Sequence, residues 1–412
     1  MPLLASPALL ISFGPDGPAR IPLSMLIIFV SAKLMAELAE RVGQPGIVGE
    51  ILAGVLVGPS AFGWLAPNEF LSALSDLGAM FLLFRVGLEV KSSELMKVGG
   101  TATLVAFSGV VVPFLMGTGI LLAWGAGTNE AIFVGASMVA TSVGITASVL
   151  SAKGLLHEIS SKIILAAAVI DDVLGLLVLA VVSSLTHGKL DLLQLSLSAL
   201  AAIAFTVIVA KWGTHAMNHV VPHVERRWRV AEARFVMSLS LLFALSLLAV
   251  YTGVAAIVGA FLAGLALGES GGERERDLAQ GVSELLVPFF LAGIGLHVNL
   301  SAFTRASTAI LAVVILAAAV VSKFIGCGLG ALGLGKTDAL RVGLGMVPRG
   351  EVGMVVAQLG LGYGILSQGS YGVVVFMSVA TTIVAPPLIK VGYKTLLQAA
   401  RPPLEEEVFR LE

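Results

Sequence analysis

The chain contains about a dozen apolar runs of roughly 17–25 residues, and these runs constrain its fold more than any other feature. Each run is long enough to cross a hydrocarbon layer of about 30 Å as an α-helix. A backbone surrounded by lipid must satisfy its own hydrogen bonds, which favours helices, and the alternating segments typical of a transmembrane barrel are absent. Only 12% of the residues are charged, about half the share found in soluble domains. We therefore predict an all-α polytopic membrane protein.

The basic residues orient these runs in the membrane. With the N-terminus outside, 18 of the 25 Lys and Arg residues fall on inner loops or on the C-terminal tail, and three fall on outer loops. This asymmetry follows the positive-inside rule and indicates an inner-membrane protein with a cytoplasmic C-terminus. It also favours an odd number of spans, and we predict about thirteen: 22–40, 46–60, 74–90, 101–124, 131–153, 160–185, 192–212, 235–252, 254–269, 282–299, 307–333, 338–362 and 368–392.

Charge and cysteine content exclude other classes. The formal net charge is −1, so no nucleic-acid partner is indicated, and the single cysteine, Cys327, excludes an intrachain disulfide. We expect no cofactor.

The two halves of the sequence resemble each other. VGEILAGVLVGPS (48–60) matches VGAFLAGLALGES (258–270) at seven of thirteen positions. Matched spans are seven apart, an odd number, so partners run in opposite directions through the membrane. The pattern predicts two inverted six-helix repeats, an architecture of many secondary transporters. Two further matches lie at nearly the same offset: RVGLEV (85–90) with GIGLHV (293–298), and SVGIT (142–146) with EVGMV (351–355).

Two partner spans carry an interruption near their middle. In 131–153 it is Thr141–Gly144, and in 338–362 it is Pro348–Gly353. Proline removes a backbone donor and glycine weakens a helix, so both spans are expected to break. Paired broken helices are the best sequence indication of a substrate site, because half-helix ends place partial charges at mid-membrane. The alternative is a kink that serves packing alone.

Three ionisable residues lie at the same predicted depth. Asp171 and Asp172 are central in 160–185, and Lys323 is central in 307–333. A charge at the bilayer centre costs several kcal/mol, so it is normally paired and functional. Neighbouring helical residues point about 100° apart, so one aspartate can pair with Lys323 while the other faces an ion. A purely structural ion pair is the alternative, but it leaves the second carboxylate unexplained. Carboxylates beside backbone oxygens suit a small hard cation such as Na⁺ or Li⁺.

Five segments between about residues 44 and 392 carry a family resemblance: GEILAGVLVGPS, ATSVGITASVL, IDDVLGL, VSKFIG and MVPRGEVGMVV. They resemble the second monovalent cation:proton antiporter family, particularly its NapA-type sodium/proton members, which are distant relatives of NhaA. The Kef-type potassium/proton relatives usually have a neutral residue where this chain has Asp171, and they add a nucleotide-binding domain.

The resemblance implies an NhaA-like fold with crossed discontinuous helices in a single membrane domain (1–412), assembled as a homodimer. A transport subdomain would slide against a dimerisation subdomain in an elevator-type cycle. The implied parts are dimerisation segments 22–90 and 235–299, transport segments 101–185 and 307–392, and a linker helix at 192–212.

The resemblance also assigns roles by position. It makes Asp172 the carboxylate that binds either the transported Na⁺ or a proton, and Asp171 the partner of Lys323. Thr141 and Ser142 would donate oxygen ligands.

Other polar residues are less decided. Arg349 and Glu351 lie at a break, where they could pair with each other or serve the site as accessory residues. Lys33 and Glu37 are one helical turn apart and are expected to pair. His215, His219 and His223 would share a helix face as a metal-binding or pH-sensing cluster, or as part of an interfacial anchor.

Together these features predict a secondary antiporter that exchanges Na⁺ or Li⁺ for H⁺, electrogenic if Lys323 also releases a proton. Potassium/proton exchange on the same fold is the nearest alternative, and a cation channel is a more distant one. An enzyme is not expected, because an intramembrane aspartyl protease needs aspartates on two separate helices.

Overall fold

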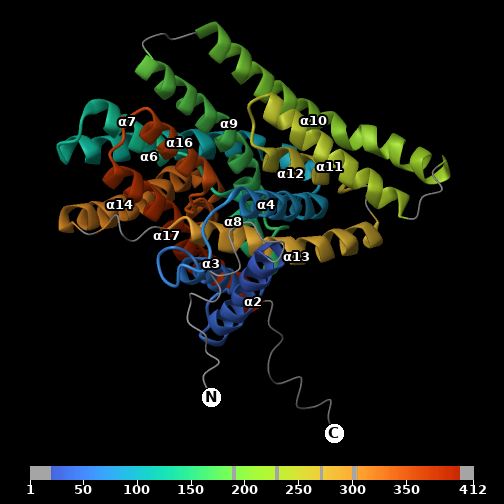
Figure 1. The fold of residues 1–412 in the computed structure, drawn as a ribbon. Coiled ribbons are helices and arrows are strands. Elements are labelled where there is room, and N and C mark those ends of the chain that lie inside the picture. The colour runs from blue at the N-terminus through green and yellow to red at the C-terminus, as the bar shows by residue number, and fades with distance from the viewer. Residues whose placement is uncertain are drawn as a thin grey trace, which may run out of the picture.

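The computed structural model describes residues 20–187, 192–227, 232–269, 272–298, 303 and 305–399. Within these ranges every regular element is helical, in keeping with the predicted all-α class (Figure 1). Both chain ends, 1–19 and 400–412, lie outside the described residues.

The described helices follow the predicted spans closely. Their bounds are α2 (Arg20–Arg41), α3 (Gly46–Val57), α4 (Glu69–Glu89), α5 (Ser92–Lys97), α6 (Gly99–Ala123), α7 (Thr128–Ser137), α8 (Val143–Ala152), α9 (Ile159–His187), α10 (Leu192–Arg227), α11 (Ala233–Tyr251), α12 (Ala256–Leu267), α13 (Glu273–Leu296), α14 (Ala306–Gly330), η2 (Leu332–Leu334), α15 (Lys336–Gly345), α16 (Glu351–Gly362), α17 (Gln368–Gly392) and α18 (Lys394–Ala399).

Many of these helices are suited to lipid. Eight described helices are long and apolar enough to cross a membrane, judged by length and composition. Shorter apolar helices include α3, α8 and α12. Each of the thirteen predicted ranges contains a helix, while thirteen crossings remain a prediction.

The helices contact one another in two groups. In the first, α4 packs on α12 and α13, and α2 packs on α3; in the second, α14 packs on α6 and α17. Figure 1 shows α4, α11 and α12 on one side of the view and α6, α7 and α14 on the other. The long helix α10 contacts α11 and α12 as well as α9. The functional division into transport and dimerisation subdomains stays a prediction.

Small residues allow close approach within the first group. A β-carbon on Gly264 of α12 would lie 2.1 Å from the Phe84 carbonyl oxygen of α4. At the related repeat position, a β-carbon on Gly54 of α3 would lie 1.9 Å from the Ala292 carbonyl oxygen of α13. Glycine lets helix backbones approach this closely in lipid. The sequence repeat thus coincides with a repeated helix contact, while two inverted repeats remain a prediction.

The predicted pairing of Lys33 with Glu37 is wrong. Lys33 Nζ instead lies 2.9 Å from Glu50 Oε1 on α3, and Glu37 pairs with Arg41 at 2.9 Å. Glu50 is only 6% exposed, and a buried carboxylate without a counter-charge is costly. The longer-range pair therefore takes precedence over the local one.

Candidate functional site

Two interrupted helices meet at their breaks. The first break separates α7 from α8 across 138–142, and the second separates α15 from α16 across 346–350. The Ser142 backbone N–H donates a hydrogen bond of 2.9 Å to the Pro348 carbonyl oxygen. A β-carbon on Gly350 would lie 2.8 Å from both Cβ and Oγ of Ser142. Glycine at this position therefore lets the second break press against the Ser142 side chain.

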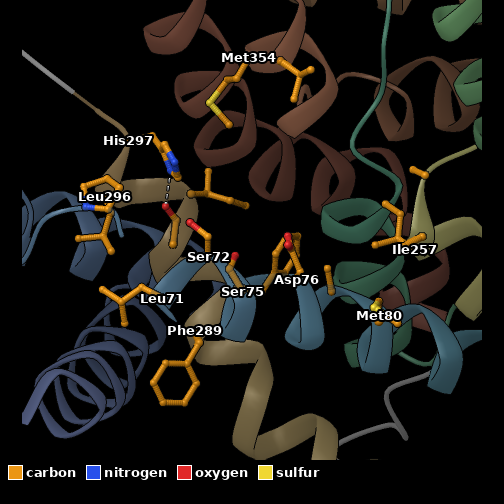
Figure 2. A pocket seen from close by; sticks show the side chains of 18 of the residues that line it. Leu71, Ser72, Ser75, Asp76, Met80, Ile257, Phe289, Leu296, His297 and Met354 are labelled. Carbon is orange, nitrogen blue, oxygen red and sulfur yellow. Dashed lines mark hydrogen bonds between the residues drawn. The ribbon is translucent and has the colours of Figure 1, made fainter. Parts of the chain in front are cut away.

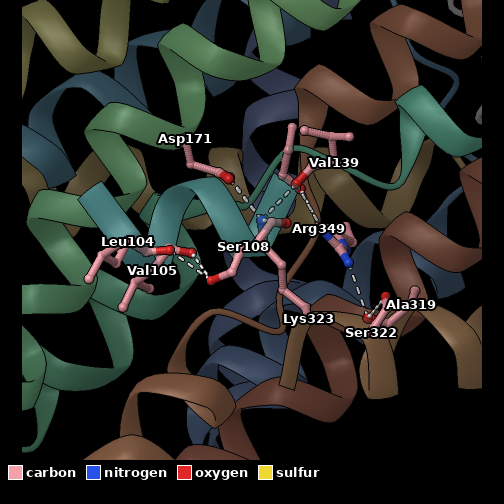
Figure 3. A network of polar contacts seen from close by, with 11 residues as sticks. Leu104, Val105, Ser108, Val139, Asp171, Ala319, Ser322, Lys323 and Arg349 are labelled. Atoms are coloured by element: carbon pink, nitrogen blue, oxygen red, sulfur yellow. Dashed lines mark hydrogen bonds and ion pairs between the residues drawn. The ribbon is translucent and has the colours of Figure 1, made fainter. Parts of the chain in front are cut away.

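Asp171 and Lys323 form an ion pair inside the protein. Lys323 Nζ lies 2.8 Å from Asp171 Oδ1 and 3.1 Å from Oδ2, and neither side chain is exposed. The ammonium also donates to the carbonyl oxygens of Gly109 and Val139, each at 2.8 Å (Figure 3). An ammonium has three N–H groups, so the charged form of Lys323 is fully satisfied.

Arg349 supplies a second buried cation beside this pair. Its Nη1 donates to the carbonyl oxygens of Val139 (3.0 Å) and Ala140 (3.3 Å), and its Nη2 donates to Ala319 (3.1 Å) (Figure 3). Val139 and Ala140 lie two and three residues beyond the end of α7, and the C-terminal end of a helix carries a partial negative charge. Two cations therefore stabilise the carbonyl end of the first half-helix. Within the described contacts Arg349 bonds to backbone oxygens, and the Glu351 side chain lies outside the described residues.

The remaining predicted site residues are buried, Thr141 and Ser142 at the first break and Asp172 within α9. Thr141 is 4% exposed, Ser142 is 2% exposed, and Asp172 on α9 is 3% exposed. Helix α9 contacts both α7 and α8. The hydroxyl oxygens of Thr141 and Ser142 have no hydrogen-bond partner in the described part of the chain. Leaving a buried hydroxyl unpaired costs about 1–3 kcal/mol, so two neighbouring ones suggest oxygen donors kept for a ligand.

The comparisons with known proteins place the chain in a family. The family model for the sodium/hydrogen exchanger, transmembrane, matches residues 26–391. The chain belongs to the sodium/hydrogen exchanger family. The resemblance to sodium/proton antiporters noted in the sequence is confirmed at the level of this family. The prediction of a multi-pass membrane protein is confirmed as well. Members of this family are transporters, which agrees with the expectation that this exchanger homologue is not an enzyme.

Two curated relatives cover nearly the whole exchanger chain. The high-affinity Na⁺/H⁺ antiporter NhaS3 of Synechocystis sp. is 33% identical, over 91% of this chain and 90% of its own length. The Na⁺/H⁺-K⁺ antiporter GerN of Bacillus cereus is 32% identical, over 88% of this chain and 94% of its own.

A solved structure shares the exchanger fold. The sodium proton antiporter MjNhaP1 from Methanocaldococcus jannaschii superposes with a TM-score of 0.71 over 94% of this chain and 99% of its own. Its sequence identity of 17% limits that comparison to the fold.

The sequence analysis named the side chains that the structure brings together around Lys323, but it missed their backbone acceptors. Gly109, Val139 and Ala319 contribute carbonyl oxygens, and a carbonyl contact leaves no mark in residue type. The one indirect sequence signal for Gly109 is that it is a glycine. A β-carbon there would lie 2.5 Å from Cys327 Sγ, so the position has no room for a side chain. The breaks themselves could have suggested Val139, since the last residues before a helix break have free carbonyls.

The structure does not bring the histidine cluster to the site. His215 and His219 lie on α10, with their ring centroids 4.7 Å apart, and each of the three histidines is exposed. Among the described residues, no group of three or more His, Cys, Asp or Glu side chains could hold a metal ion.

Proposed function

We propose that this exchanger homologue carries Na⁺ or Li⁺ across the membrane in exchange for H⁺, with Asp172 as the group that binds either the cation or a proton. The observation that carries the proposal is the pair of buried hydroxyls of Thr141 and Ser142 at the first helix break, which have no hydrogen-bond partner among the described residues. Na⁺ and Li⁺ take oxygen ligands, and a carboxylate with two hydroxyls supplies them. The relatives NhaS3 and GerN, both named as sodium/proton antiporters, favour the same substrates.

Exchange follows from competition at a single carboxylate. Asp172 carries a proton or a cation, and the loaded site crosses the membrane in either form. In the proposed cycle the segments 101–185 and 307–392 move as a transport subdomain against 22–90 and 235–299. The protein is a homodimer in the inner membrane, with its N-terminus outside and its C-terminus in the cytoplasm.

The proposal is tested by dye-monitored proton movement in proteoliposomes across a series of Na⁺, Li⁺ and K⁺. Asp172→Asn cannot ionise, so we expect it to abolish cation-driven proton flux while the protein still folds. Asp277→Asn is the matched control, because it makes the same chemical change at an exposed position of α13. Full Na⁺-driven proton flux in Asp172→Asn would overturn the mechanism.

A second candidate is potassium/proton exchange by the same residues. The name of GerN, which includes K⁺, is the observation that favours it. Proton flux driven by K⁺ as strongly as by Na⁺ would support this alternative, whereas a channel would not drive protons against their gradient.

A further inference from the structure

A cavity of about 470 Å³ opens between the two groups of helices. One wall comes from α4, α12 and α13, and the opposite wall carries Met354 and Gln358 of α16. Figure 2 shows Ser72, Ser75 and Asp76 on α4, on the side of the cavity facing Met354. The cavity lies toward the start of α4 and the end of α13, which is the outer end in the proposed orientation.

Asp76 is an unusual residue for this position. It is the eighth residue of the 21-residue helix α4, about 10 Å along the helix axis from Glu69. Its side chain is exposed to the cavity and contacts no cation and no hydrogen-bond donor among the described residues. An ionisable residue inside a membrane span normally faces protein or a water-filled cavity and serves an ion pathway. Ser72 and Ser75 add two hydroxyls on the same wall.

The floor of the cavity lies next to the first helix break. Phe290 lines the cavity and is itself 5% exposed. A β-carbon on Gly144 would lie 3.1 Å from the Phe290 ring, and Gly144 is the second residue of α8. Ser142 immediately precedes that helix. One aromatic ring therefore stands between the cavity and the backbone that carries the proposed ion ligands.

We propose that this cavity is a cation vestibule in which Asp76 is a second binding residue for the transported cation, ahead of Asp172. The carboxylate holds a partly hydrated monovalent cation, with the hydroxyls of Ser72 and Ser75 as further oxygen donors. Phe290 closes the passage between the vestibule and the break. Asp76 raises the local cation concentration and carries no transported proton, so its loss affects cation capture and leaves the exchange step intact. This role rests on the proposed function.

The kinetic test compares Asp76→Asn with the wild type in right-side-out and inverted membrane vesicles. With Na⁺ on the outer side at low ionic strength, we expect the apparent KM for Na⁺ to rise about threefold to tenfold, with an unchanged maximal rate. With Na⁺ on the inner side, KM should not change. Asp76→Glu should restore the outer KM. Glu69→Gln is the matched control, because it removes one negative charge from the same helix at a residue that does not line the cavity.

A second test does not depend on transport. In Ser72→Cys, a thiol placed one helical turn from Asp76 is modified with methanethiosulfonate reagents that carry either trimethylammonium or sulfonate. We expect the cationic reagent to react faster, Na⁺ to slow it, and Asp76→Asn to reduce this preference about threefold or more. The wild-type protein is the control for background modification, since Cys327 is fully buried.

The two proposals fail in different ways. If the wild type exchanges Na⁺ for H⁺ but Asp76→Asn leaves the apparent KM for outer Na⁺ unchanged, the vestibule proposal is overturned and the proposed function stands. Equal modification rates for the two reagents would do the same, even if the wild type moved no Na⁺. Absence of Na⁺-driven proton flux in the wild type, with the reagent preference retained, would overturn the proposed function and leave the cation site at Asp76.

Discussion

Lys323 directs its three N–H groups to acceptors on Asp171, Gly109 and Val139, so each partner supports the others. Removing one charge of a buried pair typically costs about 3–5 kcal/mol, because the remaining charge is left without compensation. We expect Asp171→Asn and Lys323→Gln each to lower the free energy of unfolding by an amount of this order. The double variant should lose less unfolding free energy than the sum of the losses in the two single variants. Thermal unfolding in detergent compares the wild type, the two single variants and the double variant. Strictly additive losses of stability would contradict a coupled pair.

Thr141 and Thr146 offer a contrast between a functional and a structural hydroxyl. Thr141 Oγ1 is buried without a described partner, whereas Thr146 Oγ1 donates to the Gly345 carbonyl oxygen at 2.6 Å. We expect Thr141→Ala to raise the apparent KM for Na⁺ with no loss of stability, because it removes an ion ligand and an unpaired polar group. Thr146→Ala should lower stability by about 1 kcal/mol and leave KM unchanged. Flux titrations and melting curves of both variants check this, and the opposite pattern would remove Thr141 from the site.

At the scale of elements, the two breaks depend on one close contact. Gly350 has no room for a side chain, since a β-carbon would lie 2.8 Å from Ser142. We expect Gly350→Ala to push the breaks apart and reduce exchange at least tenfold at equal expression. At the far end of α16, the helix that Gly350 precedes, a β-carbon on Gly362 would meet nothing within 4 Å, so Gly362→Ala serves as the control. Proteoliposome flux normalised to protein measures both, and equal activity would show that the contact is dispensable.

These elements also show how far the sequence could predict the site. The observed breaks at 138–142 and 346–350 overlap the predicted interruptions at Thr141–Gly144 and Pro348–Gly353, which follow from local chemistry. Burial of one aspartate with Lys323 follows from the cost of lone charges in lipid, whereas the choice of Asp171 came from the family resemblance. The carbonyl acceptors at Gly109 and Ala319 depend on how distant helices pack, which residue type does not reveal. The same reason explains the error at Lys33, whose partner Glu50 lies on another helix. The vestibule residue Asp76 stood in a predicted span, but only the packed helices show the cavity around it.

For the whole molecule, the two groups of helices are separated on one side and joined elsewhere. The cavity separates α4 from α16. Near the C-terminal ends of α17 and α4, two hydrogen bonds connect α17 to the turn between α2 and α3, and α4 to α8. Lys390 Nζ of α17 donates to the Gly43 carbonyl oxygen at 2.7 Å, and Arg85 of α4 donates to Ser151 Oγ at 2.6 Å. In the proposed elevator cycle, such an arrangement would be one end-state, with the cavity open toward α16.

Charge accounting in this end-state leads to a prediction about voltage. A guanidinium is not deprotonated in proteins, so Arg349 does not alter the count. With a proton on Asp172 and Lys323 paired with Asp171, the other three groups sum to zero. When Na⁺ binds, Asp172 ionises, and if Asp171 also turns toward the ion, Lys323 loses its counter-charge. The prediction is that Lys323 then releases a second proton.

Two protons would then move for each Na⁺, with a net transfer of one charge. That transfer is worth roughly 2.3 kcal/mol per 100 mV, so an imposed potential should accelerate or slow Na⁺ efflux. The test sets the voltage across proteoliposomes with K⁺ gradients and valinomycin and compares the wild type with Lys323→Gln, which cannot release a proton. We expect the wild type to respond to voltage and any residual exchange in Lys323→Gln to be electroneutral. Efflux that ignores voltage in the wild type, or a full voltage response in Lys323→Gln, would show that Lys323 only holds the fold together through Asp171, Gly109 and Val139.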